Sequence, residues 1–191
     1  MTRTLRRVLV ITVLAAVTGA LAWGLFIALP KKYGSSHATA APAPTPAPPA
    51  GPKIKANLFY VSDDGQQLIQ REQDVPFGAG TVDQAREILA AELAPVSDPL
   101  VSAIPSGTKL RRVFITERGQ AYVDLSREVS VNHPGGTLNE LLTVYALVDA
   151  VTANLPAVTS VQLLVEGKEV ATLAGHVDLR RPLTKNLSWV Q

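Results

Sequence analysis

The stretch from Gly135 to Leu183 limits the possible folds more than any other part of the chain. Within it, Thr137 to Asn154 is predicted to form a helix, because apolar side chains recur there at helical spacing. These side chains are Leu138, Leu141, Leu142, Tyr145, Val148, Val151 and Leu155. The polar face is narrow, so we expect other structure, a sheet above all, to cover the helix. Pro156 disfavours helical geometry at the residue before it and should end the helix there.

Two short strands are predicted after this helix. Val158 to Val165 alternates apolar and polar side chains, which is typical of a strand with one buried face. The segment Glu166-Gly167-Lys168-Glu169 is predicted to be a tight type II′ turn, with the glycine at its first central position. Val170 to Leu173 would then return as the partner strand, followed by a polar tail.

The first half of the folded region predicts two further hairpins. Ile54 to Val61 and Leu68 to Val75 are strand-like and flank the turn Asp63-Asp64-Gly65. Leu110 to Thr116 and Gln120 to Leu125 form the second pair.

Each helix is predicted to begin with a capping box. Thr81 and Gln84 open a helix between the two hairpins, and Thr137 and Glu140 have the same spacing at the later helix. The predicted order is therefore ββαββαββ. The expected fold class is α+β, with a mixed sheet of three hairpins, two helices packed on it and one transmembrane helix in front.

The N-terminal region predicts a membrane anchor. Val8 to Leu29 contains no charged residue, and as a helix it would be about 33 Å long, enough to cross a bilayer core. The alternative is a signal peptide cleaved near Ala38-Thr39-Ala40, although the apolar run is long for one. Arginines ahead of the run favour a cytoplasmic N-terminus and an extracytoplasmic C-terminal domain. Reversed topology, with a cytoplasmic domain, is the weaker alternative.

These features divide the chain into four predicted regions. They are a cytoplasmic N-terminus at 1–7, a transmembrane anchor at 8–29, a Pro/Ala-rich linker at 30–52 and a folded domain at 53–191. The Ala-Pro repeats of the linker favour extended polyproline II geometry, which suits a stalk.

Composition excludes several classes of function. The chain has no cysteine, so disulfides, thiolate metal sites, thiol catalysis and a lipid-modified cysteine are excluded. Five of the 18 basic residues, which are Arg3, Arg6, Arg7, Lys31 and Lys32, precede Lys53, leaving 13 basic against 16 acidic residues in the rest. The predicted domain is therefore mildly acidic, and we expect no nucleic-acid partner.

Few residues are candidates for chemistry. The sequence contains no nucleophile elbow, phosphate loop or dinucleotide fingerprint. Asp124, His133 and His176 could meet as a metal or triad-like set, but their spacing alone is weak support. A turn or cap is the plainer role for Asp124. Asp149, at the margin of the apolar stripe, is more simply a hydrogen-bonded edge carboxylate than a catalytic base.

Three arginines could form a local anion patch. Arg111, Arg112 and Arg118 lie near one another in the sequence, although solvated charges at strand ends, with Glu117 close by, explain them as well. We therefore assign no catalytic residue, no metal and no cofactor, and the binding residues stay unknown.

Several motifs together resemble the GerMN domain family of spore germination and sporulation proteins. They are Phe59-Tyr60-Val61, Ile104-Pro105-Ser106-Gly107-Thr108, Ala121-Tyr122-Val123-Asp124-Leu125-Ser126, Gly135-Gly136-Thr137 and Val161-Gln162-Leu163-Leu164-Val165-Glu166-Gly167. The resemblance covers roughly Ile54 to Leu183. It implies an extracytoplasmic α/β module with no known catalytic residues and kinship with ring-building modules of secretion-type assemblies. This chain carries one copy and no cysteine for lipid attachment, which weakens a sporulation-specific role.

Two hypotheses of function follow. The first is a non-catalytic interaction module that scaffolds or assembles envelope complexes, with envelope proteins or further copies of itself as partners and the membrane contacted through Val8 to Leu29. The alternative is a cell-wall-associated hydrolase or a small-ligand-binding domain, which requires a pocket with convergent polar groups.

Overall fold

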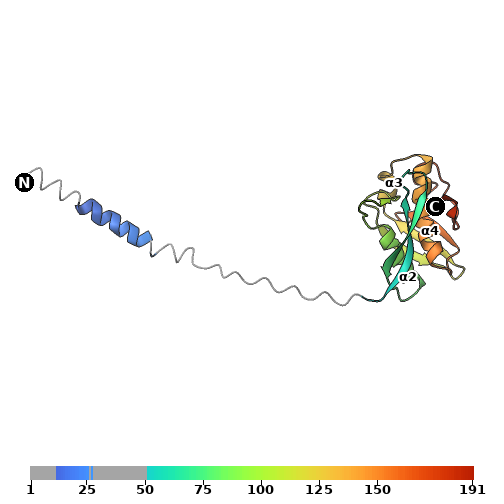
Figure 1. The fold of residues 1–191 in the computed structure, drawn as a ribbon, viewed down its shortest axis with the longest axis horizontal. Helices are drawn as coiled ribbons and strands as arrows, with labels where there is room; N and C mark the ends of the chain where they lie inside the picture. The colour runs from blue at the N-terminus through green and yellow to red at the C-terminus, as the bar shows by residue number, and fades with distance from the viewer. Residues whose placement is uncertain (1–11, 26, 28–50) are drawn as a thin grey trace, which may run out of the picture. The chain divides into compact units, whose positions relative to one another are not determined.

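The computed structural model describes residues 12–25, 27 and 51–191. Residues 12–25 form a helix whose side chains are exposed. Among the described residues, no helix combines the length and the apolar character needed to cross a membrane. The predicted anchor Val8 to Leu29 extends past the described helix at both ends, and regions 1–7 and 30–50 lie outside the described residues. Ala50–Gln191 forms a compact unit of its own (Figure 1).

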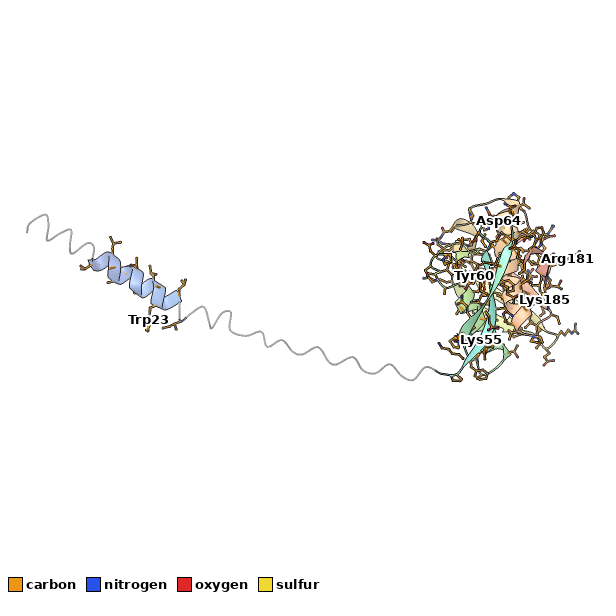
Figure 2. The ribbon with its side chains drawn as sticks, viewed as in Figure 1. Trp23, Lys55, Tyr60, Asp64, Arg181 and Lys185 are labelled. Carbon is orange, nitrogen blue, oxygen red and sulfur yellow. The ribbon has the colours of Figure 1, made fainter. Side chains whose placement is uncertain are left out.

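The first sheet contains three antiparallel strands in the order β2-β1-β3. They are β1 at Lys53–Val61, β2 at Leu68–Pro76 and the short β3 at Val101–Ser102. The predicted turn between β1 and β2 is confirmed, since Gly65 adopts φ +71 and its N–H donates to Ser62 O. Lys55 and Asp64 mark opposite ends of this long hairpin in Figure 2.

The second sheet contains four strands in the order β4-β5-β6-β7. They are β4 at Leu110–Ile115, β5 at Gln120–Leu125, β6 at Ser160–Val165 and β7 at Lys168–Glu169. Strands β5 and β6 are parallel, whereas the other pairs are antiparallel. The prediction of one mixed sheet is therefore wrong. Strand patterns identify strands but not their neighbours, and a parallel pair requires the long helical connection found between β5 and β6.

The last predicted hairpin is shorter than expected. Val165 pairs with Lys168, so Glu166 and Gly167 are the central turn residues, with φ of 53° and 75°. Two positive φ values correspond to a type I′ turn and not to the predicted type II′ turn. The predicted strand Val170 to Leu173 is absent, because the backbone N–H of Leu173 donates to the Glu140 side chain instead.

The α+β class is confirmed, and α4 is the central helix. Its bounds, Thr137–Asn154, match the predicted helix, and it contacts both β1 and β6 as well as α2 at Thr81–Glu92. Eleven of its residues are buried, so it is covered on nearly all sides. The predicted order is incomplete, because it lacks the short strand β3, the helix α3 at Glu128–Val131 and the 3₁₀ turn η1 at Leu187–Trp189. The turn η1 lies against α4 (Figure 1).

Neither predicted capping box forms. Gly80 and Gly136 occupy the N-cap positions, and no side chain caps either helix. Gln84 is largely buried, where it accepts from Gly78 N at 2.9 Å and donates to Pro76 O at 3.1 Å. Glu140 likewise turns toward the interior. Burial against distant backbone therefore outweighs local capping at both positions.

Candidate functional site

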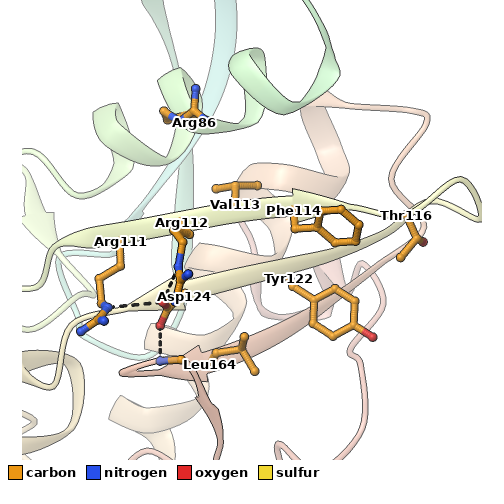
Figure 3. Close-up of a pocket in the computed structure, with 10 residues that line it drawn as sticks. Arg86, Arg111, Arg112, Val113, Phe114, Thr116, Tyr122, Asp124 and Leu164 are labelled. Carbon is orange, nitrogen blue, oxygen red and sulfur yellow. Dashed lines mark hydrogen bonds and ion pairs between the residues drawn. The ribbon is translucent and has the colours of Figure 1, made fainter.

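A groove of about 790 Å³ lies along β4 and β5 and is lined by three arginines and two aromatic side chains. Its lining is Arg86, Arg111, Arg112, Val113, Phe114, Thr116, Tyr122, Asp124, Leu164 and Gly167 (Figure 3). Arg86 comes from α2, which packs beside β4. The groove therefore borders the outer strand of the second sheet and the middle of helix α2.

Strand alternation explains which side chains reach the groove. Arg112 lies opposite Asp124 and Phe114 lies opposite Tyr122 in the β4–β5 register, so all four share one face of the sheet. Val113 and Val123 lie opposite each other, and their side chains are buried on the other face. One face of this hairpin is thus buried in the core, and the polar and aromatic side chains lie on the other face, toward the groove.

A buried carboxylate organises the polar end of the groove. Asp124 is 3% exposed, and its Oδ1 accepts from Gly167 N at 2.6 Å. Its Oδ2 lies 3.3 Å from Arg111 Nε and 3.5 Å from Arg112 Nε (Figure 3). A register shift between Leu110 and Arg112 allows two successive arginines to approach one carboxylate.

Arg111 and Arg112 differ in the number of their ion-pair partners. Arg111 Nη1 also lies 2.6 Å from Glu166 Oε2, and the hydrogen bond that Arg111 donates to Glu166 raises the Arg111 pKa. The Arg112 side chain is 75% exposed and has only the Asp124 contact among the ion pairs of the described residues. Of the three arginines considered as an anion patch, Arg111 and Arg112 pair with Asp124 or Glu166, whereas Arg118 is exposed and does not line the groove.

An exposed aromatic pair lies next to Arg112. The Phe114 and Tyr122 ring centroids are 6.3 Å apart at an interplanar angle of 45°, and Phe114 is 62% exposed. Aromatic and arginine side chains are enriched where proteins bind one another. The chemistry of this groove is therefore that of a contact surface with one available cation.

Asp124 pairs with Arg111 and Arg112, whereas His133 and His176 both interact with Glu140 and not with Asp124. His133 lies 3.2 Å from Thr143 Oγ1 through Nε2, and burial lowers its pKa. His176 Nδ1 lies 3.3 Å from Glu140 Oε2. No group of three His, Cys, Asp or Glu residues in the described part of the chain is arranged to hold a metal ion. The triad-like hypothesis is therefore wrong in its geometry.

Glu140 is the polar residue whose role the sequence pattern concealed. It is fully buried and accepts from Leu173 N at 2.7 Å, Ala174 N at 2.9 Å and His176 N at 2.7 Å. Burial opposes its ionisation most strongly, but these N–H donors outweigh burial and lower the Glu140 pKa. The one available signal was a glutamate on an otherwise apolar helix.

Asp149 has the predicted hydrogen bond but does not lie at an edge. It is fully buried and accepts from Asn186 N at 2.9 Å, while its Oδ2 has no hydrogen-bond partner in the described part of the chain. Burial raises the Asp149 pKa to about 6. Asp149 and Glu140 thus hold two parts of the C-terminal segment against α4.

Residues 57–171 match the family model Germane, described as sporulation and spore germination. The chain belongs to the Germane family. This confirms the resemblance to GerMN domains. No curated protein matches the chain significantly.

Solved structures share this Germane fold. A protein described as a lipoprotein from Clostridium perfringens is 25% identical, with a TM-score of 0.50 over 70% of this chain and 88% of its own. The first GerMN domain of the sporulation protein GerM from Bacillus subtilis is 20% identical, with a TM-score of 0.51 over 70% and 96%. The tandem GerMN domains of GerM are 20% identical to this chain, with a TM-score of 0.52 over 72% of this chain and 46% of theirs.

The Germane match includes the whole groove but ends before the C-terminal segment. All groove residues fall between Arg86 and Gly167, inside the matched range. Leu173, Ala174, His176 and Asn186, which donate to Glu140 and Asp149, lie beyond it. The groove therefore belongs to the family segment, whereas the C-terminal segment that binds Glu140 and Asp149 does not.

Proposed function

We propose that this Germane protein is a non-catalytic interaction module of the cell envelope that helps to assemble envelope complexes of the sporulation or germination type. The observation that carries the proposal is the open groove, with exposed Phe114 and Arg112 on a rigid sheet. Family membership and the likeness to a lipoprotein support an extracytoplasmic setting. Partner proteins would bind at this groove.

The use of the buried acids supports a non-catalytic role. Glu92, Asp124, Glu140 and Asp149 each accept a backbone N–H from a segment distant in the chain. A carboxylate that accepts backbone N–H groups in this way has a structural function. The ionisable groups of the interior therefore serve the fold.

Membrane attachment through Val8 to Leu29 is part of the proposal. The described helix at 12–25 carries large apolar side chains that are more than half exposed, including Leu21 at 65% and Trp23 at 71%. Such a surface is expected to enter a lipid or protein environment. A phosphatase reporter fused after Gln191 should be active only outside the cytoplasm, and activity confined to a cytoplasmic reporter would contradict this topology.

Site-specific photo-crosslinking in cells tests the groove as the working surface. A benzoylphenylalanine placed at position 114 should give a discrete adduct with an envelope protein, and Arg112→Glu should remove it. Position 77 is the matched control, because Phe77 is 57% exposed but does not line the groove. Equal adducts at both positions, or none at position 114, would count against the proposal.

A small-ligand-binding role is the second candidate. Its support is the groove volume of about 790 Å³, within the range usual for small-molecule sites, together with its arginine and aromatic lining. Native mass spectrometry of the purified full chain should then show a retained small molecule that Arg112→Glu releases. A chain that carries no added mass would leave the interaction module as the better explanation.

A further inference from the structure

Strand β4 is an outer strand of the second sheet, and among the described strands it pairs with β5 alone. Thr116 N donates to Gln120 O at 2.9 Å, which fixes the alternation of hydrogen-bonded pairs along this hairpin. Phe114 and Arg112 then direct their backbone groups toward β5. Val113 and Ile115 direct theirs away from it, and within the described residues no hydrogen bond to another segment engages them.

The other long outer strand shows what a protected edge looks like in this domain. Strand β2 presents exposed Gln70, Arg71, Glu72 and Asp74 along its middle, which is a common defence against pairing with another chain. Strand β4 has its exposed charges at Arg111 and Arg112 and presents an exposed phenylalanine, Phe114, toward its other end. Its register shift lies at Leu110/Arg112, so the run from Arg112 to Ile115 stays regular. Helix α2 packs beside β4 but makes no hydrogen bond to Val113 or Ile115, so among the described residues the outward backbone groups of this edge stay unpaired.

We infer that the β4 edge binds an extended acidic segment of a partner protein, which adds to the second sheet as a further strand. The inference rests on the proposed function and names the chemistry of the partner. Main-chain hydrogen bonds to Val113 and Ile115 supply the binding, and alternate side chains of the segment supply the selectivity.

Charge and shape at the groove define the segment. On the face shared by Arg112 and Phe114, successive outward side chains of an added strand lie two residues apart. An acidic side chain pairs with the 75% exposed Arg112, and an apolar side chain two residues away packs on Phe114 and Tyr122. Arg111 is already held by Asp124 and Glu166, and Arg86 by Asp83. Arg112 is therefore the main determinant of charge selectivity.

The test uses the ¹⁵N-labelled full chain in detergent micelles and the peptide acetyl-Thr-Asp-Thr-Val-Thr-Asp-amide. The peptide has an aspartate two residues before and two residues after its valine. It can therefore place an acid at Arg112 and the valine at Phe114 whether it binds parallel or antiparallel to β4. We expect saturable shifts confined to 111–116 and at least about tenfold slower hydrogen exchange at the Val113 and Ile115 amides. Arg112→Glu and Phe114→Ser should each weaken binding about tenfold or more. Phe77→Ser should leave it unchanged.

Two control peptides separate strand addition from simple charge attraction. A peptide with lysine in place of both acids should not bind, and a peptide N-methylated at its central residues should lose binding because it lacks the strand donors. Binding by either control, shifts elsewhere on the domain, or no saturable shift would overturn the inference. So would a concentration-dependent dimer joined at β4, which would assign the edge to a second copy.

The two proposals fail separately. If position 114 crosslinks an envelope protein but the acidic peptide does not bind, the interaction module stands and the strand-addition inference falls. If the peptide binds at β4 but position 114 gives no adduct in cells, the edge chemistry stands and the envelope role falls.

Discussion

At the scale of single residues, the balance between burial and backbone N–H donors sets the pKa of each buried acid. Glu140 accepts three backbone N–H groups, and its pKa lies below the ordinary value. Glu92 and Asp149 accept from one residue each, and burial raises the pKa of both. One donor does not offset the desolvation of a buried carboxylate, whereas three do.

Asp149 should make stability depend on pH. Its pKa is about 6 in the fold against an ordinary 3.8, so folding favours the protonated form. The stabilisation of the fold by protonated Asp149 is complete below pH 3.8 and is lost as the pH rises through 6. Between pH 7.5 and pH 5 the unfolding free energy should gain about 1.4 kcal/mol from this group. Urea titrations of Asp149→Asn should lack that gain.

The control for this prediction is Asp63→Asn in the exposed β1–β2 turn, which should keep the full pH dependence. Comparing variants at both pH values cancels the effects of other groups, including Glu92 and His133. An unchanged pH dependence in Asp149→Asn would mean that the buried carboxyl does not titrate in this range.

At the scale of elements, the β4–β5 turn also positions β6. Gly119 adopts φ +78 in this turn, and its O accepts from Thr159 N at 2.8 Å just before β6 begins. A Cβ at Gly119 would overlap Ala157 O. The turn therefore fixes where β6 enters its parallel register beside β5.

Gly119→Ala should be far more destabilising than Gly65→Ala. Both glycines have positive φ, which costs an alanine about 1–2 kcal/mol, but only Gly119 would also meet a backbone oxygen. We expect urea unfolding to give a loss of about 3 kcal/mol or more for Gly119→Ala and about 1 kcal/mol for Gly65→Ala. Equal losses would show that the contact with Ala157 can relax.

Local sequence patterns predicted the elements better than their partners. Apolar periodicity placed α4 at its observed bounds and both long hairpins close to theirs, because burial imposes that period directly. Sheet pairing, the reach of Glu140 and the grouping of Arg111 with Asp124 depend on contacts between distant segments. No local pattern encodes such contacts. The aromatic and cationic groove was missed for the same reason, since its residues come from α2, β4, β5 and β6 and the β6–β7 turn.

At the scale of the whole domain, the C-terminal segment ties the layers together. Leu173, Ala174 and His176 donate to Glu140 on α4, and Gln162 on β6 donates to Leu179 O. Farther on, Leu183 pairs with Val161, and Val190 bridges Leu68 of the first sheet. One irregular segment thus contacts the central helix and both sheets.

Two truncations of the C-terminal segment should therefore differ sharply in the stability that remains. Ending the chain after Thr184 removes the donor to Asp149 but keeps those to Glu140, so the domain should unfold cooperatively with a loss of roughly 2–4 kcal/mol. Ending it after Ala171, where the Germane match stops, removes all three donors to Glu140 and the buried side chains of Leu173 and Leu179. An uncompensated buried charge alone costs about 3–5 kcal/mol.

The sum of these losses after Ala171 is comparable to the whole stability of a domain, about 5–15 kcal/mol. We therefore expect thermal melts followed by near-ultraviolet circular dichroism to show no cooperative transition for this truncation. Glu140→Gln in the same truncated chain should recover part of the folded signal, because a neutral amide is less costly to bury than a charge. A cooperative melt at the midpoint of the intact chain would show that the family segment holds its own core, and that the C-terminal segment only covers it.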